Sequence, residues 1–273
     1  MTGSWSSWRA GPSDRASGRV VPMSKRSEHP IGIDFGGTGI KAAAVDLGAG
    51  DFASDREKID TPKPATPDAV AKVFEELVAR FPSSDSAIGV TVPGVVRRGV
   101  VHSAANIDPA WIGADADAIF TAALGREVHV VNDADAAGLA EVEFGAAKGQ
   151  RGLVIVTTLG TGIGSALIHN GVLVPNSELG HLEIDGHDAE SRAANSAREN
   201  ESLSYPVWAE RLTTYYRTVE RLFSPELIVV GGGVSKSFDR FGPLIDIETP
   251  IVPATLRNKA GIIGAALVSS RAG

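Results

Sequence analysis

The sequence Gly-Thr-Gly-Ile occurs twice in this chain, at 37–40 and again at 160–163. Each copy follows an apolar run, at 31–35 or at 153–157, and leads into a second run that is apolar or alternating. This pattern predicts a strand, a glycine turn and a returning strand at both places. The copies lie about 120 residues apart. That spacing is typical of two similar domains that face each other, rather than of a short tandem array.

The residues of each turn offer groups suited to phosphate. Glycine permits positive φ and close approach of another molecule, and the threonine adds a hydroxyl donor beside bare backbone N–H groups. Taken alone, either copy also fits an ordinary hairpin turn that binds nothing. The recurrence after the same kind of buried strand favours a nucleotide or polyphosphate gripped between two lobes. The turns comprise Gly36, Gly37, Thr38 and Gly39, and Gly160, Thr161 and Gly162.

Composition sets the class of protein. With 273 residues, 43% of them apolar and 22% charged, the chain is long enough for two domains with full cores. A net charge of −7 argues against nucleic-acid binding through the overall field, although a local basic groove stays open. The absence of cysteine excludes disulfides and thiolate metal sites. Without an apolar run of about 18 residues or a signal peptide, we expect a cytoplasmic protein with no membrane partner.

The pattern along the chain predicts mixed α/β structure. Residues 1–29 have no hydrophobic periodicity and are expected to form a disordered tail. The only methionines are Met1 and Met23, so we hypothesise that translation begins at Met23. The remaining periodicities indicate two α/β lobes with mixed sheets. The expected elements are helices at 67–81 (with Thr66 as N-cap), 133–144, 205–223 and 259–271, strands at 87–92, 127–131 and 226–230, and a hairpin at 95–102. On the helix at 205–223 the expected apolar side is Leu212, Tyr215, Tyr216, Val219, Leu222 and Phe223.

Two acidic positions stand at the ends of predicted strands. Asn132-Asp133 follows the strand at 127–131, at the edge where α/β folds place their ligands. Helix capping explains this pair equally well, and the two roles are compatible. Asp34 closes the first strand just before a glycine turn, where a carboxylate can hold the water shell of a magnesium ion. An Asx-type turn bond is its alternative.

The segment 178–185, Glu-Leu-Gly-His-Leu-Glu-Ile-Asp, concentrates hydrogen-bonding side chains. Paired acceptors of this kind grip the vicinal hydroxyls of a sugar. A metal site is the rival interpretation, with Glu178, His181, His187 and Asp188 as ligands, but the spacing matches no standard zinc pattern. Solvated loop charge stays open as a third interpretation.

Several well-known site types are excluded by missing motifs. The chain has no G-x-x-x-x-G-K-[ST] run and no G-x-G-x-x-G after a strand, so neither a P-loop nor a dinucleotide-binding fingerprint is present. It also lacks a G-x-S-x-G nucleophile elbow, which leaves a serine hydrolase without support.

Taken together, these motifs resemble the ROK sugar kinases. The resemblance runs from about Ile31 to Val268 and is carried, in order, by 34–38, 132–133, 159–164, 178–181 and Gly231-Gly232-Gly233. The stretches 177–185, 203–211 and 253–266 are similar, more narrowly, to the actinobacterial polyphosphate glucokinases of that family, including the glucomannokinase type.

The resemblance implies an actin-like, ribonuclease H-like fold with two lobes, duplicated mixed β-sheets and a central cleft. It implies a small N-terminal lobe at 30–132, a large C-terminal lobe at 133–257, and a C-terminal helix at 258–273 that packs back on the first lobe. Asp133 would be the catalytic base. Asn106, Asn132, Glu178 and His181 would contact the sugar, Gly36 to Gly39, Lys41 and Gly160 to Gly162 would bind phosphates, Asp34 would act through Mg²⁺, and Gly231, Gly232 and Gly233 would lie by the nucleotide.

One departure from the family pattern concerns metal. Most ROK members carry a cysteine-rich zinc motif after Glu-x-Gly-His, and residues 186–199 here contain no cysteine. We therefore expect no zinc and favour a sugar-binding role for His181. The family's glutamate beyond that motif has no sure counterpart, so Glu190 and Glu199 stay unassigned.

The implied activity is phosphoryl transfer from inorganic polyphosphate or ATP to the 6-hydroxyl of glucose, with mannose left open, by a homodimer. A polyphosphate chain needs a cationic track, although single surface bases are usually only solvated; the candidates are Lys41, Arg97, Arg98, Lys148, Arg151, Arg192 and Arg198. A sugar-binding ROK-type regulator without kinase activity is the alternative. It would need a separate DNA-binding domain, for which residues 1–29 are too few. An actin-like ATPase that turns over ATP without sugar is the third interpretation.

Overall fold

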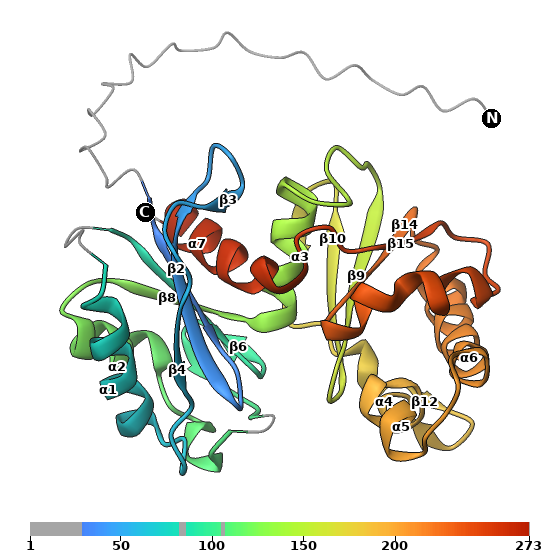
Figure 1. The fold of residues 1–273 in the computed structure, drawn as a ribbon, viewed down its shortest axis with the longest axis horizontal. Coiled ribbons are helices and arrows are strands. Elements are labelled where there is room, and N and C mark those ends of the chain that lie inside the picture. Colours follow the sequence, from blue (N-terminus) through green and yellow to red (C-terminus); the bar gives the residue numbers. More distant parts are fainter. Residues whose placement is uncertain (1–28, 82–85, 105–106, 273) are drawn as a thin grey trace, which may run out of the picture.

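Two mixed β-sheets, each carrying its own helices, form the body of the molecule in the computed structural model, which describes residues 29–81, 86–104 and 107–272 (Figure 1). The first sheet has the order β3-β2-β1-β5-β8, with β4 paired to β2. Its strands are β1 (Ile31–Phe35), β2 (Gly39–Asp46), β3 (Asp51–Phe52), β4 (Glu57–Asp60), β5 (Ile88–Val92) and β8 (Val128–Asn132). The second sheet has the order β11-β10-β9-β14-β15. Its strands are β9 (Leu153–Leu159), β10 (Ile163–His169), β11 (Val172–Val174), β14 (Leu227–Gly231) and β15 (Ile251–Pro253).

The two sheets repeat one topological plan. In the first, β1 pairs antiparallel with β2 and parallel with β5, which pairs parallel with β8. In the second, β9 pairs antiparallel with β10 and parallel with β14, which pairs parallel with β15. The repeated glycine motif therefore marks equivalent hairpins, and the predicted duplication of mixed sheets is confirmed.

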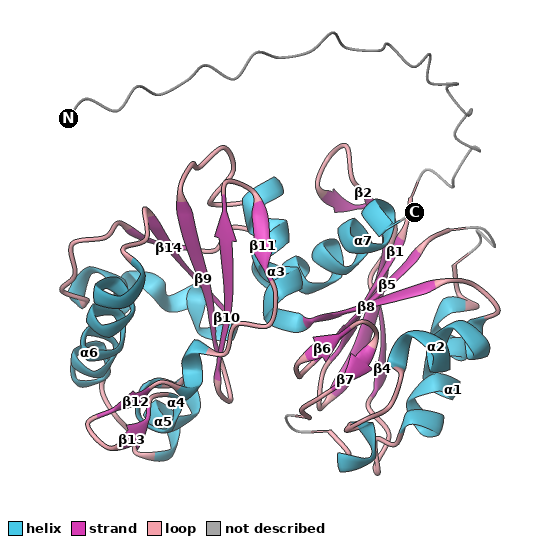
Figure 2. Ribbon diagram, turned by 180° about the vertical axis from the view of Figure 1, so that it is seen from behind, coloured by secondary structure: helices cyan, strands magenta, loops and turns pink. Residues whose placement is uncertain are grey.

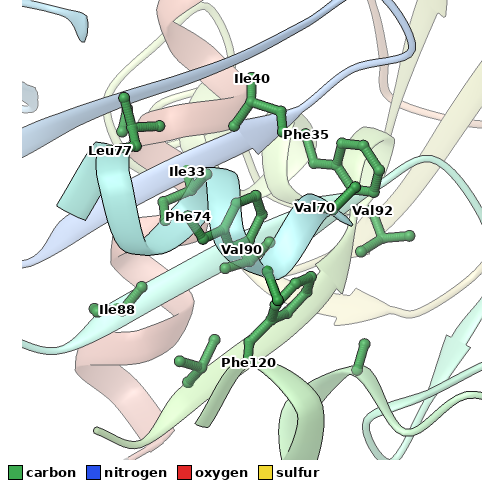
Figure 3. Close-up of a cluster of buried hydrophobic side chains, with 14 of the residues drawn as sticks. Ile33, Phe35, Ile40, Val70, Phe74, Leu77, Ile88, Val90, Val92 and Phe120 are labelled. Atoms are coloured by element: carbon green, nitrogen blue, oxygen red, sulfur yellow. The ribbon is translucent and has the colours of Figure 1, made fainter. Parts of the chain in front are cut away.

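An aromatic core fills the space between the first sheet and two helices, α1 (Pro67–Val78) and α2 (Ala116–Leu124) (Figure 3). Phe74 of α1 stacks on Phe120 of α2 with ring centroids 4.4 Å apart, and Phe35 at the end of β1 meets Phe74 edge-on at 6.2 Å. Trp111 packs against both Phe35 and Phe120. Since large buried aromatic side chains contribute much of a core's hydrophobic stabilisation, this cluster fixes the position at which β1 ends and the first glycine turn begins.

Two helices, α3 (Asp133–Glu143) and α7 (Ala260–Ala272), lie between the two sheets (Figures 1 and 2). α3 continues directly from β8 of the first sheet but packs on β9 and β10 of the second. α7 comes from the far end of the chain and packs on β1 and β5 of the first sheet, as well as on α3. The start of α3, and with it Asp133, is therefore held by both halves of the molecule.

Glycines let α7 approach the first sheet this closely. A Cβ added at Gly32 of β1 would lie 1.9 Å from the carbonyl oxygen of Ile262, and one at Gly89 of β5 would lie 1.8 Å from that of Ala265. Both contacts are with backbone atoms, which cannot move aside as a flexible side chain can. Any side chain at either position would push α7 away from the sheet.

The helices of the second half pack around α6 (Tyr205–Phe223), with the short helices α4 (Glu190–Ala193) and α5 (Asn195–Asn200) below it (Figure 1). Trp208, Leu212, Tyr215, Tyr216 and Val219 of α6 are buried against the second sheet. The predicted apolar side is correct at Leu212, Tyr215, Tyr216 and Val219, and at Phe223, which is partly buried against the same core. It is wrong at Leu222, which is 56% exposed.

The predicted elements agree with the structure apart from shifts of a few residues at their ends. The helix expected at 67–81 begins at Pro67 with Thr66 as its N-cap, but it ends at Val78. The hairpin expected at 95–102 is β6 (Val96–Arg97) with β7 (Val100–Val101). The expected tail lies outside the described residues, except for residue 29. Among the helices of the described ranges, none combines the length and the apolar character that crossing a bilayer requires.

Candidate active site

Asn132 and Asp133 stand at the junction where β8 becomes α3. The Asn132 side-chain oxygen accepts hydrogen bonds from the backbone N–H groups of Ala134 (2.9 Å) and Asp135 (3.0 Å), so this residue is the N-cap of α3. Its amide nitrogen donates to the carbonyl oxygen of Gly94 at 3.0 Å, which joins the cap to the segment after β5. The capping role is therefore present, and it fixes the position of Asp133 in the first helical turn.

The Asp133 carboxyl faces a pocket of about 180 Å³ in the cleft between the two sheets. Solvent reaches its side chain, but the surrounding protein still strips water from the carboxylate. This desolvation, followed by the charges of Asp34 and Glu178, raises the pKa of Asp133 to about 6. A carboxyl with a pKa in this range is ionised near neutral pH and still has appreciable affinity for a proton, as a general base requires.

Asp34 lies on the same pocket, at the end of β1. Its Oδ2 pairs with Lys41 Nζ at 3.1 Å, and its Oδ1 accepts a hydrogen bond of 3.3 Å from the Thr91 hydroxyl. Lys41, expected at a phosphate, thus contacts Asp34 from the neighbouring strand. The pairing follows from register, because Asp34 stands opposite Lys41 in the β1–β2 hairpin.

The two glycine turns expose backbone N–H groups. The first turn closes with a hydrogen bond from Gly36 N–H to the Gly39 carbonyl (3.2 Å), and the second with one from Gly160 N–H to the Gly162 carbonyl (3.0 Å). Within the described residues, the N–H groups of Gly37, Thr38 and Thr161 have no acceptor. Unpaired donors at a strand turn are suited to oxygen atoms of an anion.

One of the two expected reasons for glycine in these turns, a positive φ, is wrong. Residues 36, 37, 39, 160 and 162 all keep negative or extended φ, so none uses the left-handed region. Close packing explains Gly162, because a Cβ there would lie 2.3 Å from Oε2 of Glu190, an atom that the Ile163 N–H holds in place. A Cβ at Gly39 would lie 2.6 Å from Cε of Lys58, but that atom belongs to the flexible end of a side chain that is 55% exposed and can move aside.

Glu178 is held near the cleft by the hydroxyl of Ser165 on β10. That hydroxyl donates to the Ser177 carbonyl at 2.7 Å and accepts from the Leu179 N–H at 2.9 Å. Burial, as the largest cause, raises the pKa of Glu178, and the nearby His181 opposes the shift. Since the Glu178 charge also acts on Asp133, the structure brings these two carboxyls into one site.

His181 ends the short 3-10 helix η2 (Leu179–His181). Its Nδ1 lies 2.8 Å from Oδ2 of Asp188, and this hydrogen bond is the main cause that raises the pKa of His181. With Nδ1–H donated to Asp188, Nε2 is the ring nitrogen left to meet another molecule.

Glu190, unassigned from the sequence, is a residue that sequence reasoning missed. Its Oε2 accepts a hydrogen bond of 3.0 Å from the Ile163 N–H, directly after the second glycine turn. Ligand atoms of His181, Asp188 and Glu190 lie within 4.8 Å of one another, a set that differs from the one considered in the sequence. Because these groups already bond to each other or to the backbone, they are satisfied without an ion. The expectation of no zinc stays a prediction.

Gly231 and Gly232 border the same pocket as Asp34 and Asp133. Gly232 has φ of 82°, and a Cβ there would lie 2.4 Å from the Leu159 carbonyl oxygen, so this position requires glycine. Gly233 begins the 3-10 helix η3 (Gly233–Arg240). Asn106 lies outside the described residues. Thr158, Arg257 and Asn258 also line the pocket. Arg257 and Asn258 lie in the stretch 253–266 that carries the narrower resemblance, but no role in the site was predicted from the sequence for any of the three.

Comparison with known proteins identifies the family. The model for the ROK family matches residues 30–201. The chain belongs to the ROK family. The polyphosphate glucokinase of Mycobacterium tuberculosis (strain CDC 1551 / Oshkosh) is 50% identical over 250 residues, which cover 91% of this chain and 94% of that protein. The family and the fold expected from the motifs are thus confirmed.

Two solved structures of ROK-type kinases resemble this fold. The inorganic polyphosphate/ATP-glucomannokinase from Arthrobacter sp. strain KM has a TM-score of 0.87 and 53% identity, covering 90% of this chain and 100% of that chain. A ROK family glucokinase from Streptomyces griseus, solved with glucose and AMPPNP, has a TM-score of 0.76 and 26% identity, covering 89% and 99%. The architecture described above is therefore that of the sugar kinases of this family.

Proposed function

We propose that this ROK protein is a phosphotransferase that moves a phosphoryl group from inorganic polyphosphate or ATP to the 6-hydroxyl of glucose. The observation that carries the proposal is the Asp133 carboxyl with its raised pKa, at a helix start in the pocket that it shares with Asp34 and Gly231. The glycine turns that follow β1 and β9 add free N–H groups. Half of the residues are also identical to a polyphosphate glucokinase over most of the chain. The glucomannokinase that shares its fold is named for both donors.

In this proposal each group has a distinct task. Asp133 accepts the proton of the sugar hydroxyl as that oxygen attacks the terminal phosphorus, and the bond from phosphorus to the donor oxygen breaks in line. Glu178, the Nε2 of His181, Asn132 and Asn106 orient the sugar hydroxyls. The free N–H groups of the two turns meet phosphate oxygens, and Gly231 to Gly233 border the nucleotide when ATP is the donor. Such transfer depends mainly on position and charge neutralisation.

A magnesium ion fits the carboxylates of the cleft. Asp34 and Asp133 are close enough for the charge of Asp34 to raise the pKa of Asp133, and such mutual repulsion is relieved by a cation. Carboxylate oxygens are also the ligands that Mg²⁺ prefers. Asp34 would hold the ion through its water shell, and the ion would neutralise charge on the donor phosphates. We further propose a cytoplasmic homodimer; mannose as a second acceptor follows only from the glucomannokinase name.

A sugar-binding regulator of the same family is the alternative function. It would use the sugar contacts but would need neither a base with a raised pKa nor turns with free N–H donors. The arrangement around Asp133 thus favours the kinase.

The test is an assay of hexose 6-phosphate formation with glucose or mannose as acceptor and with polyphosphate or ATP as donor. Each of the four reactions is run with Mg²⁺ and after its removal by EDTA. We expect glucose 6-phosphate from both donors only with Mg²⁺. Tight glucose binding without product from either donor would instead favour the regulator.

A further inference from the structure

A second pocket, of about 450 Å³, lies outside the cleft at the start of α6. Six residues line it, namely Arg198, Leu203, Ser204, Tyr205, Pro206 and Arg240. Four of these open the run 203–211, which carries the narrower resemblance to polyphosphate glucokinases. Neither the sugar contacts nor the phosphate turns account for this pocket.

Two guanidinium groups define its chemistry. The guanidinium carbon of Arg240 lies 4.2 Å from the centre of the Tyr205 ring, and that of Arg198 lies 4.8 Å from the same ring. Tyr205 also stacks on Phe241, with ring centroids 5.9 Å apart. Stacking on a ring fixes the plane of a guanidinium and leaves its N–H edge free to meet an anion.

The pocket holds more positive than negative charge. Arg198 shares its charge with Glu199 at 3.2 Å and donates to the Asn195 side chain at 3.0 Å. Arg240 is exposed and has no carboxylate partner among the described residues. In a protein of net charge −7, an arginine pair held on one ring is a local site for anions against an acidic background.

This pocket is connected to the second glycine turn through α5. The N–H of Ser196 donates to the Gly160 carbonyl at 3.0 Å, and its hydroxyl donates to the Thr161 carbonyl at 2.5 Å. Arg198 stands two residues further along the same helix, about 3 Å along its axis, and its side chain points to the opposite side, toward Tyr205. A polyphosphate that begins on the turn therefore reaches Arg198 only if it is long enough to pass around α5.

We propose that Arg198, Tyr205 and Arg240 form a subsite for the distal phosphates of a long inorganic polyphosphate, beyond the phosphates held in the cleft. The inference rests on the proposed function, because it takes polyphosphate as the donor. A polyphosphate carries negative charge along its whole length, so each unit that reaches the arginine pair adds an attraction that a short donor lacks. The subsite thus favours long chains over short ones.

The experiment compares Arg240→Gln with Arg221→Gln. Arg221 is an exposed arginine in the last turn of α6, far from the pocket along that helix, so both variants lose one charge. KM is measured for tripolyphosphate and for long-chain polyphosphate at low ionic strength. We expect Arg240→Gln to raise the long-chain KM about fivefold, the equivalent of about 1 kcal/mol, with the tripolyphosphate KM and kcat unchanged. Arg221→Gln should change neither KM.

Two results would overturn the subsite. One is that Arg240→Gln and Arg221→Gln have the same KM for long-chain polyphosphate. The other is that Arg240→Gln raises the KM for tripolyphosphate as much as it raises the KM for the long chain. If the wild-type protein forms no glucose 6-phosphate from any polyphosphate, the proposed donor itself is wrong, which distinguishes the two failures. An Arg198→Gln variant with an unchanged melting temperature should reproduce the effect of Arg240→Gln on the long chain only.

Discussion

The backbone N–H of Asn176 donates a hydrogen bond of 2.7 Å to Oδ2 of Asp135, which lies two residues after the proposed base on α3. The Asn176 side chain in turn accepts from Val96 N–H and donates to the Val96 carbonyl, both at 2.8 Å. Asn176 has φ of 59°, in the left-handed region that asparagine tolerates. One residue therefore links the start of α3, the segment before Glu178 and the β6–β7 hairpin.

This link predicts a pH-dependent stability. Burial is the largest cause that raises the pKa of Asp135 to about 7, and the charges of Glu178 and Asp133 add to it. The unfolded carboxyl has a pKa near 3.9, so between about pH 4 and pH 7 the folded state binds more protons than the unfolded state. The contribution of Asp135 to the free energy of unfolding therefore falls as pH rises through this window.

The variant Asp135→Asn isolates the effect, because its amide oxygen can still accept from Asn176 but cannot ionise. The free energy of unfolding, measured with urea, should be higher for the variant than for the wild type by a larger amount at pH 8 than at pH 5. If this difference between the two proteins is the same at both pH values, the assignment is contradicted. Asp135→Ala, which also loses the acceptor, should be less stable than Asp135→Asn at both.

Removal of the proposed base tests its chemical role. Asp133→Ala should lower kcat by a factor of about 10²–10⁴, because a positioned general base contributes that much. The KM for glucose should change little, since other side chains orient the sugar. Full activity of this variant with either donor would remove Asp133 from the mechanism.

The raised pKa of Asp133 predicts the pH profile. The base acts in its ionised form, so kcat/KM should rise with pH through a limb near pH 6 and level off above it. Asp34→Asn removes a charge that raises the Asp133 pKa, so that pKa should move down. Carbon NMR titration of the aspartate carboxyls measures the shift independently of activity. If the pKa of Asp133 is the same in the Asp34→Asn variant as in the wild type, the two carboxyl groups do not interact.

Local patterns in the sequence predicted most of the elements and the positions of both glycine turns. Alternating and helical periodicities report which face of an element is buried, which is why α6 was located with its true bounds. The role of the glycines was only partly predicted, because the neighbours of Gly39 and Gly162 come from Lys58 and Glu190, on other segments. Contacts between distant residues, such as Asp135 with Asn176, leave no periodic signal in a single sequence.

The same limit applies to Glu141, two of whose hydrogen-bond partners are more than a hundred residues away. This buried carboxylate on α3 accepts hydrogen bonds from the N–H groups of Thr255 (3.2 Å) and Leu256 (2.7 Å), just before the pocket residue Arg257. It also accepts from the nearby Ala146 N–H at 2.8 Å. Glu141 thus joins α3 to the loop that leads into α7.

Glu141 and Glu143 offer a matched pair for a stability measurement. Glu141→Ala leaves three partly buried N–H groups without their carboxylate acceptor and should cost about 3 kcal/mol in the free energy of unfolding. Glu143 is half exposed and pairs with Arg271 on α7, so Glu143→Ala should cost less than about 1 kcal/mol. Both values come from urea unfolding at pH 7. If both variants lose the same free energy of unfolding, the Glu141 hydrogen bonds do not hold the loop. A larger loss for Glu141→Ala, together with reduced affinity for ATP, would show that this buried carboxylate maintains the shape of the cleft.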